Sequence, residues 1–485
     1  MLTGNNRRRL GDRVVRRPRQ AEMAPRHIHA TERRHALLSP SASALLTLSI
    51  GFAALIALGT ALLLLPVSKV GPGHADIITA LFTATSAVCV TGLVVVGSAD
   101  FWSPTGQGVL MALMAMGGLG IMTAGLVIII ALGRRVTLNQ RLIVRDTIGG
   151  ASLGGVIALG WYVVIFAVAV QVIGFLAIFA KLSFEFPVGK AAWNALFHTI
   201  SAFNNAGFTI FEDSDSLSRF KTDPVMLSII AILIVLGAIS FPVVAELARR
   251  KRPNRWSLDT KLVVIGTVSL WFIGGLSMFL FEIGNPRTLG AEPVLDQISN
   301  ATFQAITART AGFSTIDFSA TRPGNDFLFT FLMFVGGASG STAGGIKVNT
   351  AMILFVAGMA SINGRPRTEV FGRELPVAQV TRALALFLLA ILALFIVVVA
   401  LAITEVHKIE AGHFGFLDIL FEATSAMGTT GLSRGITPDL SDPGKVIVSI
   451  AMYVGRMGPL TIAMGLALRE RRAVYRFAEE RVRLG

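Results

Sequence analysis

The chain has 485 residues, of which 53% are hydrophobic and only 15% are charged, and its mean hydropathy is +0.67. Soluble proteins carry about 25% charged residues, so the composition excludes an ordinary soluble protein and indicates a membrane protein. Cys89 is the single cysteine, which excludes an internal disulfide and a cysteine metal cluster.

Stretches without charged residues recur along the chain, and each is long enough for the about 20 helical residues that cross a bilayer. Seven are uninterrupted: 36–68, 101–133, 147–180, 224–245, 262–281, 327–346 and 383–404. An eighth, 446–468, is broken only by Arg456. We therefore expect an all-α polytopic membrane protein with eight transmembrane helices.

Lys and Arg are distributed unevenly between the connections. Together 30 of the 43 Lys and Arg, but 11 of the 29 Asp and Glu, lie in residues 1–40, 132–156, 245–261, 361–382 and 469–485. The alternate connections hold 10 basic and 18 acidic residues. Because cytoplasmic loops are enriched in Lys and Arg, both termini of this plasma (inner) membrane protein should be cytoplasmic. The net charge of +14 therefore does not indicate nucleic acid.

The two ends of the chain are expected to be tails. Residues 1–38 form a basic segment without an apolar core, predicted to be disordered in the cytoplasm and to touch anionic membrane lipid. Residues 470–485 are predicted to be a cytoplasmic C-terminal tail. No connection on the basic side is long enough for a regulatory nucleotide-binding domain of its own.

A short pattern occurs four times: TSAVCVTGL at 85–93, SAFNNAGF at 201–208, TARTAGF at 307–313 and TSAMGTTGL at 424–432. A phenylalanine precedes the shared glycine by nine or ten residues, which predicts a half-length helix followed by a loop. Two copies are too short to span, so all four should be re-entrant. We therefore predict four repeats around one central pore, each made of a helix, a pore loop and a second helix (M1-P-M2). The repeats are 39–135, 150–250, 258–362 and 378–469. Their pore loops lie near 82–93, 197–208, 303–313 and 421–432.

The four loops are suited to coordinating a cation. A dehydrated K⁺ needs several oxygens, which a ring of main-chain carbonyls supplies, and glycine reaches backbone conformations that aim carbonyls inward. The half-helix before each loop directs its negative dipole end at the ion. K⁺ is the only metal expected, and the candidate filter residues are Val90, Thr91, Gly92, Asn205, Ala206, Gly207, Thr310, Ala311, Gly312, Thr429, Thr430 and Gly431.

Small residues gather 24 to 30 positions after each glycine, beginning at Gly117, Gly237, Gly336 and Gly455. Such clusters are typical of close helix packing, and their recurrence places them in the pore-lining helices. The third continues as GGASGSTAGG, whose five glycines each cost about 1 kcal/mol in a helix interior. It predicts a flexible intramembrane loop at 336–347, with a helix-packing seam as the alternative.

Arg456 occupies the position that Gly118, Ala238 and Gly337 hold in the other repeats. An arginine in mid-membrane costs about 2.5 to 3.5 kcal/mol, which suggests a function. We expect its side chain to bind carbonyls or hydroxyls of the 336–345 loop and to form an electrostatic barrier to cations. The alternative is a structural arginine paired with an unidentified acid. Arg309 should point away from the pore, toward Glu422.

The four loop motifs, in this order, resemble those of the Trk/Ktr/HKT superfamily of K⁺ transporters, specifically its Ktr-type membrane subunit (KtrB-like), from about Ser39 to the C-terminus. The resemblance implies potassium uptake, because a serine at the first filter glycine accompanies sodium transport in some plant members and position 92 is glycine here. It also implies a gate, formed by Gly336, Gly337, Ala338, Ser339, Gly340, Ser341, Thr342, Ala343, Gly344, Gly345, Lys347 and Arg456.

The resemblance further implies a homodimer seated on a ring of cytoplasmic KtrA-like nucleotide-binding subunits that respond to ATP and ADP. No bound cofactor is implied for this chain. Whether Na⁺ or protons stimulate the K⁺ flux, with Na⁺ as an activator, stays open at this stage.

The sequence gives less support to two other classes of function. A coupled transporter of organic solutes also uses repeats and broken helices, but its repeats are usually two and its site needs groups for a larger substrate. An enzyme is not expected, because no catalytic or metal-binding constellation occurs within the spans.

Overall fold

The computed structural model describes residues 40–131, 156–212, 215–249 and 252–468. The two predicted tails and the connection 132–155 lie outside these residues. Within them the chain is mostly helical. One antiparallel hairpin is formed by two strands of two residues each, β1 (Glu369–Val370) and β2 (Arg373–Glu374).

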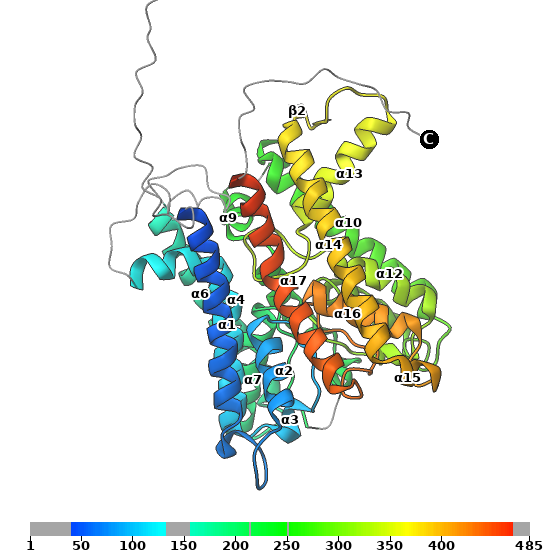
Figure 1. Ribbon diagram of the computed structural model, residues 1–485. Helices are drawn as coiled ribbons and strands as arrows, with labels where there is room; N and C mark the ends of the chain where they lie inside the picture. The colour runs from blue at the N-terminus through cyan, green and yellow to red at the C-terminus, as the bar shows by residue number, and fades with distance from the viewer. Residues whose placement is uncertain (1–39, 132–155, 213–214, 250–251, 469–485) are drawn as a thin grey trace, which may run out of the picture. The chain divides into compact units, whose positions relative to one another are not determined.

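Long helices alternate with short ones along the chain (Figure 1). The longer elements are α1 (Pro40–Leu63), α4 (Pro104–Ala131), α6 (Val156–Leu182), α8 (Pro224–Ala238) with α9 (Phe241–Arg249), α10 (Leu258–Glu282), α12 (Pro323–Phe334) with α13 (Val348–Ile362), α14 (Val377–Thr404) and α17 (Asp442–Leu468). The helices that precede the four loop motifs are α2 (Ile77–Val88), α7 (Val188–Phe203), α11 (Val294–Thr307) and α16 (Phe416–Gly428). Single turns complete the fold: η2 (Pro66–Ser68), α3 (Ser98–Phe101), η3 (Ser218–Phe220), η4 (Pro253–Arg255), η5 (Phe318–Ala320) and α15 (Val406–Glu410).

Side-chain caps begin several of these helices. Asp76 accepts from the amides of Ile78 and Thr79 at 3.0 and 3.3 Å at the start of α2. Asp223 caps α8 in the same way, with Pro224 at the first helical position. Such caps satisfy amides that have no partner inside the helix, and proline there loses no hydrogen bond.

Three helices in the described residues are long and apolar enough to cross a membrane: Trp161–Leu182, Leu258–Glu282 and Val377–Thr404. The pair α8 and α9 would make a fourth if counted as one span, although it bends by 105°. The eight-helix count and the repeat boundaries therefore remain predictions.

The span predicted at 224–245 is not one continuous helix, because α8 ends at Ala238 and α9 begins at Phe241. Pro242 explains the break: it has no amide to donate to the carbonyl of Ala238 four residues earlier, and its ring clashes there. The freed carbonyls of Gly237 and Ala238 instead accept from the amides of Thr342 and Ala338, at 3.2 and 3.0 Å. A distant segment thus completes the hydrogen bonding of this helix end.

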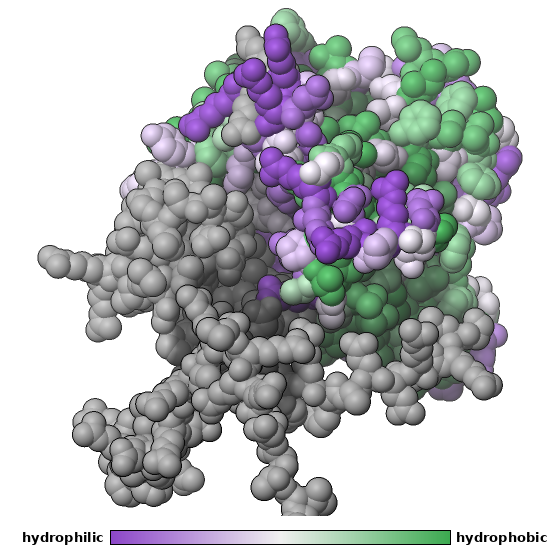
Figure 2. All heavy atoms as spheres, turned by 90° about the horizontal axis from the view of Figure 1, so that it is seen from above, coloured by the Kyte–Doolittle hydropathy of each residue, from purple (hydrophilic) through white to green (hydrophobic). Residues whose placement is uncertain are grey.

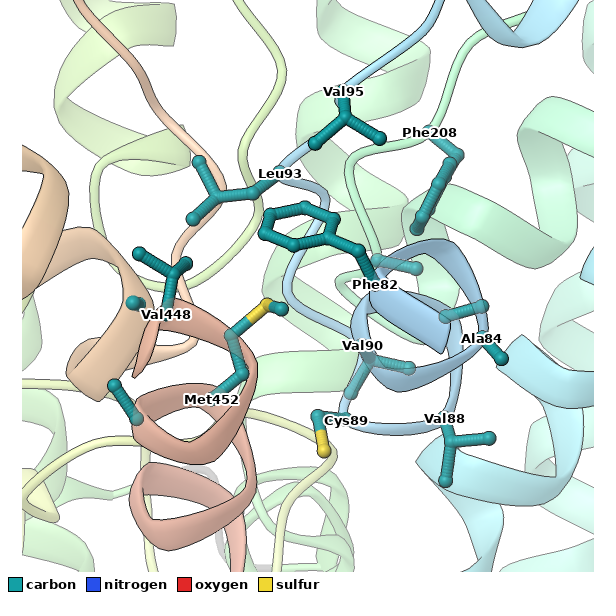
Figure 3. Packing of buried hydrophobic residues seen from close by; sticks show 14 of the residues in the cluster. Phe82, Ala84, Val88, Cys89, Val90, Leu93, Val95, Phe208, Val448 and Met452 are labelled. Carbon is teal, nitrogen blue, oxygen red and sulfur yellow. The ribbon is translucent and has the colours of Figure 1, made fainter. Parts of the chain in front are cut away.

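The core is built around the phenylalanines that precede the four glycines. Phe82, Phe197, Phe303 and Phe421 are all at most 2% exposed. Figure 3 shows Phe82 beside Leu93, with Val448 and Met452 of α17 packed nearby. The same apolar cluster therefore joins the first and last motif-bearing segments of the chain.

The connections between helices gather at two ends. Figure 1 shows α9 and β2 at one end and α3 and α15 at the other. Figure 2 views the first end, where hydrophilic side chains form much of the surface beside hydrophobic ones. This end carries the described parts of the connections predicted to be cytoplasmic.

Candidate functional site: a ring of four glycine loops

The four motif glycines meet in a closed ring. A β-carbon built on Gly92 would lie 3.1 Å from the Cα of Gly207; one on Gly207 would lie 3.0 Å from that of Gly312. The series continues from Gly312 to Gly431 at 3.1 Å and from Gly431 back to Gly92 at 3.0 Å. Segments more than 100 residues apart in sequence therefore form one continuous ring of backbone.

Carbonyl oxygens lie in the same ring. The β-carbon built on Gly92 would be 2.6 Å from the carbonyl oxygen of Ala206, and the one on Gly431 would be 2.1 Å from that of Thr91. No side chain fits at such approaches, so glycine is required sterically. All four glycines also have positive φ, between 72° and 93°, which other residues rarely adopt.

The residue two positions before each glycine has positive φ as well: Val90 at 48°, Asn205 at 58°, Thr310 at 76° and Thr429 at 50°. For β-branched residues this conformation is unusual and costs about 1 to 2 kcal/mol each. Such strain persists only where the surroundings enforce it, typically at functional sites. The regular recurrence of the strain identifies the four triplets predicted as the filter as one structural unit.

A serine at matching positions holds three of the loops. The amides of Thr91 and Gly92 donate to the carbonyl and hydroxyl oxygens of Ser86 at 2.8 and 3.1 Å. Ser425 binds Thr430 and Gly431 in the same way, at 2.8 and 3.0 Å. Sequence reasoning did not assign this role, although each serine stands four residues after the motif phenylalanine.

The second and third loops vary this pattern. The Ser201 carbonyl accepts from Ala206, while its hydroxyl donates to the carbonyl of Phe208 at 2.8 Å. The third loop is one residue shorter, and the amide of Ala311 donates to the carbonyl of Thr307 at 2.9 Å.

The second small-residue element packs against the ends of the short helices. A β-carbon on Gly117 would lie 1.9 Å from the carbonyl oxygen of Val88, and one on Gly237 would lie 1.9 Å from that of Phe203. Gly455 stands in the same relation to Met427, at 2.1 Å. The close packing predicted for these clusters is therefore present, and it supports the backbone that enters each loop.

A cavity of about 790 Å³ opens on the glycine side of the ring, and all four glycines line it. Four acidic residues also line it: Asp100, Glu212, Asp215 and Asp317. Within the described part of the chain no Lys or Arg lines this cavity. Clustered negative charge raises the local concentration of cations, so the cavity is an electrostatically suitable entrance to the ring.

The predicted interruption of the third long helix is present. Residues 335–347 between α12 and α13 are not helical, and Gly336 donates to the carbonyl of Ile346 at 2.8 Å. The loop packs against Thr310 and Thr429, since β-carbons on Gly336 and Gly344 would lie 3.1 and 1.8 Å from their side chains. It therefore lies on the side of the glycine ring opposite the cavity.

Arg456 bridges this loop to another helix. Its guanidinium donates to the carbonyl of Thr342 in the loop and, at 2.9 Å, to the carbonyl of Gly117 in α4. The residue is 4% exposed. The expected contact with a loop carbonyl is thus present. Lys347 adds a second cation, donating to the carbonyl of Ala343.

Arg309 does not pair with Glu422 as expected. It is 3% exposed and donates to the carbonyls of Val335 at 3.4 Å and Gly336 at 2.5 Å. These carbonyls have no helical partner because α12 ends at Phe334, so they attract the cation. Glu422 accepts from Ser433 at 2.8 Å and from Thr437.

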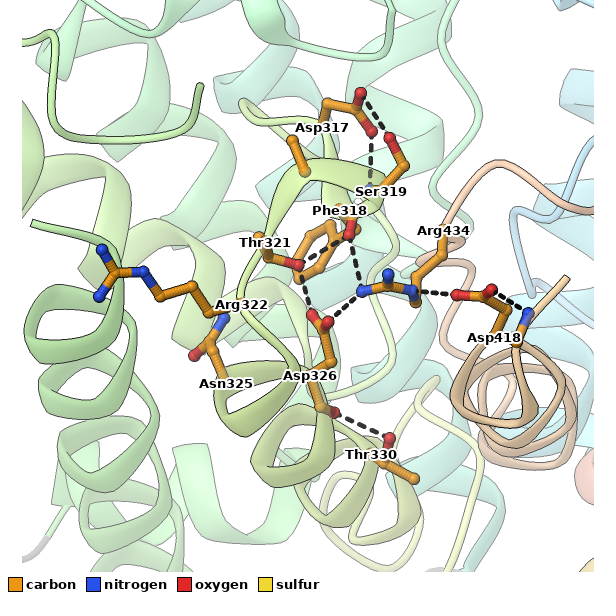
Figure 4. Close-up of polar contacts among 12 residues, drawn as sticks. Asp317, Phe318, Ser319, Thr321, Arg322, Asn325, Asp326, Thr330, Asp418 and Arg434 are labelled. Atoms are coloured by element: carbon orange, nitrogen blue, oxygen red, sulfur yellow. Dashed lines mark hydrogen bonds and ion pairs between the residues drawn. The ribbon is translucent and has the colours of Figure 1, made fainter. Parts of the chain in front are cut away.

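Arg434, three residues after the fourth motif glycine, makes structural contacts that sequence reasoning missed. Its Nε lies 2.5 Å from Asp418 at the start of α16, and its Nη1 contacts the Asp326 carboxylate at the start of α12 (Figure 4). Nη1 also donates to the carbonyl of Phe318 at 3.1 Å. The signal available in the sequence was the position of Arg434 directly after the fourth loop motif.

Arg434→Gln is expected to lower thermal stability strongly, because the Asp326 side chain is 0% exposed and would lose its cation. Breaking a buried pair costs about 3 to 5 kcal/mol. The measurement is the apparent unfolding midpoint in detergent. Arg367→Gln is the control, since its pair with Glu374 is exposed and worth about 1 kcal/mol or less. An equal shift in both variants would contradict the role of Arg434, whereas added Asp326→Asn should restore part of the loss.

The four loops form a ring that is lined with carbonyl oxygens and lies next to an acidic cavity, and the protein around them is helical and strongly apolar. These features define a transport protein for cations. A family model described as "TrkH: Cation transport protein" matches residues 52–471. The chain belongs to this family, and it is accordingly a transport protein rather than an enzyme.

Curated relatives match most of the chain. The "Ktr system potassium uptake protein B" of Bacillus subtilis is 38% identical over 423 residues, covering 87% of this chain and 93% of the relative. The "Potassium/sodium uptake protein NtpJ" of Enterococcus hirae is 36% identical over 437 residues, covering 90% and 96%. The potassium transporter TrkH from Vibrio parahaemolyticus, solved by crystallography, has a TM-score of 0.68 at 20% identity over 90% of this chain and 86% of its own, which shows a shared fold.

Proposed function

We propose that this chain is the pore-forming subunit of a potassium uptake transporter in the plasma membrane. The observation that carries the proposal is the closed ring of Gly92, Gly207, Gly312 and Gly431, with carbonyl oxygens at each junction. Such a ring can replace the hydration shell of a K⁺ ion. The relatives named as potassium uptake proteins match nearly their full length, which supports potassium as the transported ion.

The proposed arrangement has eight transmembrane helices in four repeats of helix, re-entrant pore loop and helix, with both termini in the cytoplasm. The alternation of basic and acidic connections supports this topology. On this arrangement the acidic cavity faces outward and supplies cations to the filter.

We assign a gate to the loop 336–347 together with Arg456. A guanidinium fixed at the inner end of the filter repels cations, and its bonds to Thr342 and Gly117 hold the loop to α4. Because the loop also binds Gly237 and Ala238 at the broken helix α8, its release would widen the path at several points at once.

Regulation would come from a separate subunit. Relatives named as proteins of a "Ktr system" support a system of more than one component, and we propose a homodimer on a cytoplasmic ring of nucleotide-binding subunits that respond to ATP and ADP. The name "Potassium/sodium uptake protein" of one relative motivates Na⁺ as an additional activator of the flux.

The test is uptake of K⁺, Rb⁺ and Na⁺ into liposomes that hold the purified chain. Uptake of K⁺ and Rb⁺ should exceed that of Na⁺ and should be absent from empty liposomes. Arg456→Gln should be measured beside the wild type, because a closed gate could otherwise hide the flux. Absence of cation flux in both proteins would contradict the proposal and favour a transporter of organic solutes.

A further inference from the structure

A second cavity lies at the end of the molecule away from the acidic entrance. Its volume is about 540 Å³, and two connections distant in sequence form it. One is the segment that leads into α10, and the other is the β1–β2 hairpin between α13 and α14. The lining residues are Asn254, Arg255, Trp256, Leu258, Lys261, Phe371, Gly372 and Arg373.

The lining has the chemistry of an anion site. Arg255, Lys261 and Arg373 line it, and within the described residues no carboxylate does. The neighbouring acid Glu374 pairs with Arg367 at 3.2 Å. Guanidinium and ammonium groups suit a phosphate.

The hairpin tip is shaped to complete the cavity. Phe371 and Gly372 both have positive φ, 52° and 72°, as expected for a tight hairpin turn. This turn places the Phe371 ring over the Lys261 ammonium, 5.3 Å from Nζ to the ring centroid. The cation–π contact orients Lys261, whose Nζ also donates to the carbonyl of Asn254 at 3.5 Å.

An apolar track on α10 continues from the cavity. Lys261 shares one face of the helix with Ile265, Val268 and Phe272, at intervals of four, seven and eleven residues. These three side chains are 42%, 55% and 68% exposed, and α10 is one of the helices long and apolar enough to cross a membrane. Trp256 in the lining is the residue type that gathers at membrane interfaces. A phosphate site next to an exposed apolar helix face fits the headgroup and the acyl chain of a phospholipid.

We propose that this cavity binds an anionic phospholipid, with the phosphodiester between Arg255, Lys261 and Arg373 and an acyl chain along Ile265, Val268 and Phe272. A soluble phosphate compound would use the same cations but gain nothing from the track. A bound phospholipid would place the cavity at the level of the inner leaflet. There it would hold the connections before α10 and α14 at the membrane surface.

The test is native mass spectrometry of the full purified chain with dioleoyl phosphatidylglycerol, dioleoyl phosphatidylcholine and glycerol 3-phosphate. The variant Arg255→Gln/Lys261→Gln/Arg373→Gln is compared with Arg249→Gln/Arg252→Gln/Arg365→Gln, which removes equal charge from the same connections but outside the cavity lining. The first should weaken phosphatidylglycerol binding about tenfold or more, and the second less than about twofold. Phosphatidylcholine should bind weakly, and glycerol 3-phosphate should not displace the lipid.

Equal weakening by both triple variants would overturn the site, because only total charge would then matter. Displacement by glycerol 3-phosphate at the concentration of the lipid would overturn the assignment to a lipid and favour a soluble phosphate. If the triple variant does not elute as a folded protein, Lys261→Gln beside Arg365→Gln gives the same comparison. Binding is read without ion flux, so this outcome is independent of the proposed transport function.

Discussion

Gly92→Ser is expected to reduce the preference for K⁺ over Na⁺ uptake by at least about tenfold, which corresponds to about 1.4 kcal/mol between the two ions. The β-carbon would lie 2.6 Å from the carbonyl oxygen of Ala206 and 3.1 Å from the Cα of Gly207. Both neighbours are backbone, so the ring itself must shift to accept the side chain. A displaced carbonyl changes the coordination of a dehydrated ion, and this is the step that distinguishes K⁺ from Na⁺.

A matched control separates the ring from ordinary backbone strain. Gly71 has a similar φ of +82° but no atom within 4 Å of a built β-carbon. Gly71→Ser therefore carries the same conformational cost, about 1 to 2 kcal/mol, without the clash. The measurement is K⁺, Rb⁺ and Na⁺ uptake in liposomes at equal protein content. If Gly92→Ser keeps the wild-type preference, or if Gly71→Ser loses it equally, the glycine ring is not the selective element.

Arg456→Gln is expected to raise K⁺ uptake by the isolated chain about tenfold. The substitution removes a positive charge on the side of the glycine ring opposite the acidic cavity, and with it the charged donors to the carbonyls of Thr342 and Gly117. Hydrogen bonds to charged groups contribute about 1.5 to 3 kcal/mol each, so the loop would lose a large part of what holds it to α4. Both effects favour passage of cations.

Arg456→Lys distinguishes the two effects. A lysine keeps the charge but is a single donor group, without the planar fork that reaches two carbonyls. If charge is the barrier, the lysine variant should conduct like the wild type; if the bridge between the loop and α4 matters more, it should conduct like the glutamine variant. Unchanged uptake in Arg456→Gln would remove Arg456 from the gate, provided the unfolding midpoint shows an intact fold.

The sequence alone determined the features that depend on local pattern. The four motifs predicted short helices followed by loops, and α2, α7, α11 and α16 end at those positions. Five glycines within ten residues predicted the break after α12, because glycine is costly in a helix interior. Composition excluded a soluble protein. Local propensity and periodicity decide these features, and both are readable from neighbouring residues.

Only the tertiary structure decided how distant polar groups pair. Glu422 looked like the partner of Arg309, but the end of α12 exposes carbonyls that bind Arg309 instead. The bend between α8 and α9 was missed, although Pro242 stood in the sequence, because carbonyls freed by a proline are tolerated only where other groups satisfy them.

The order of contacts within the ring and the contacts of Arg434 were undetermined for the same reason. Which carbonyl meets which glycine, and that Arg434 contacts Asp326 and Phe318, depends on segments that lie 100 or more residues apart along the chain. Sequence pattern fixes the type of residue at each position, whereas packing in three dimensions fixes its partner.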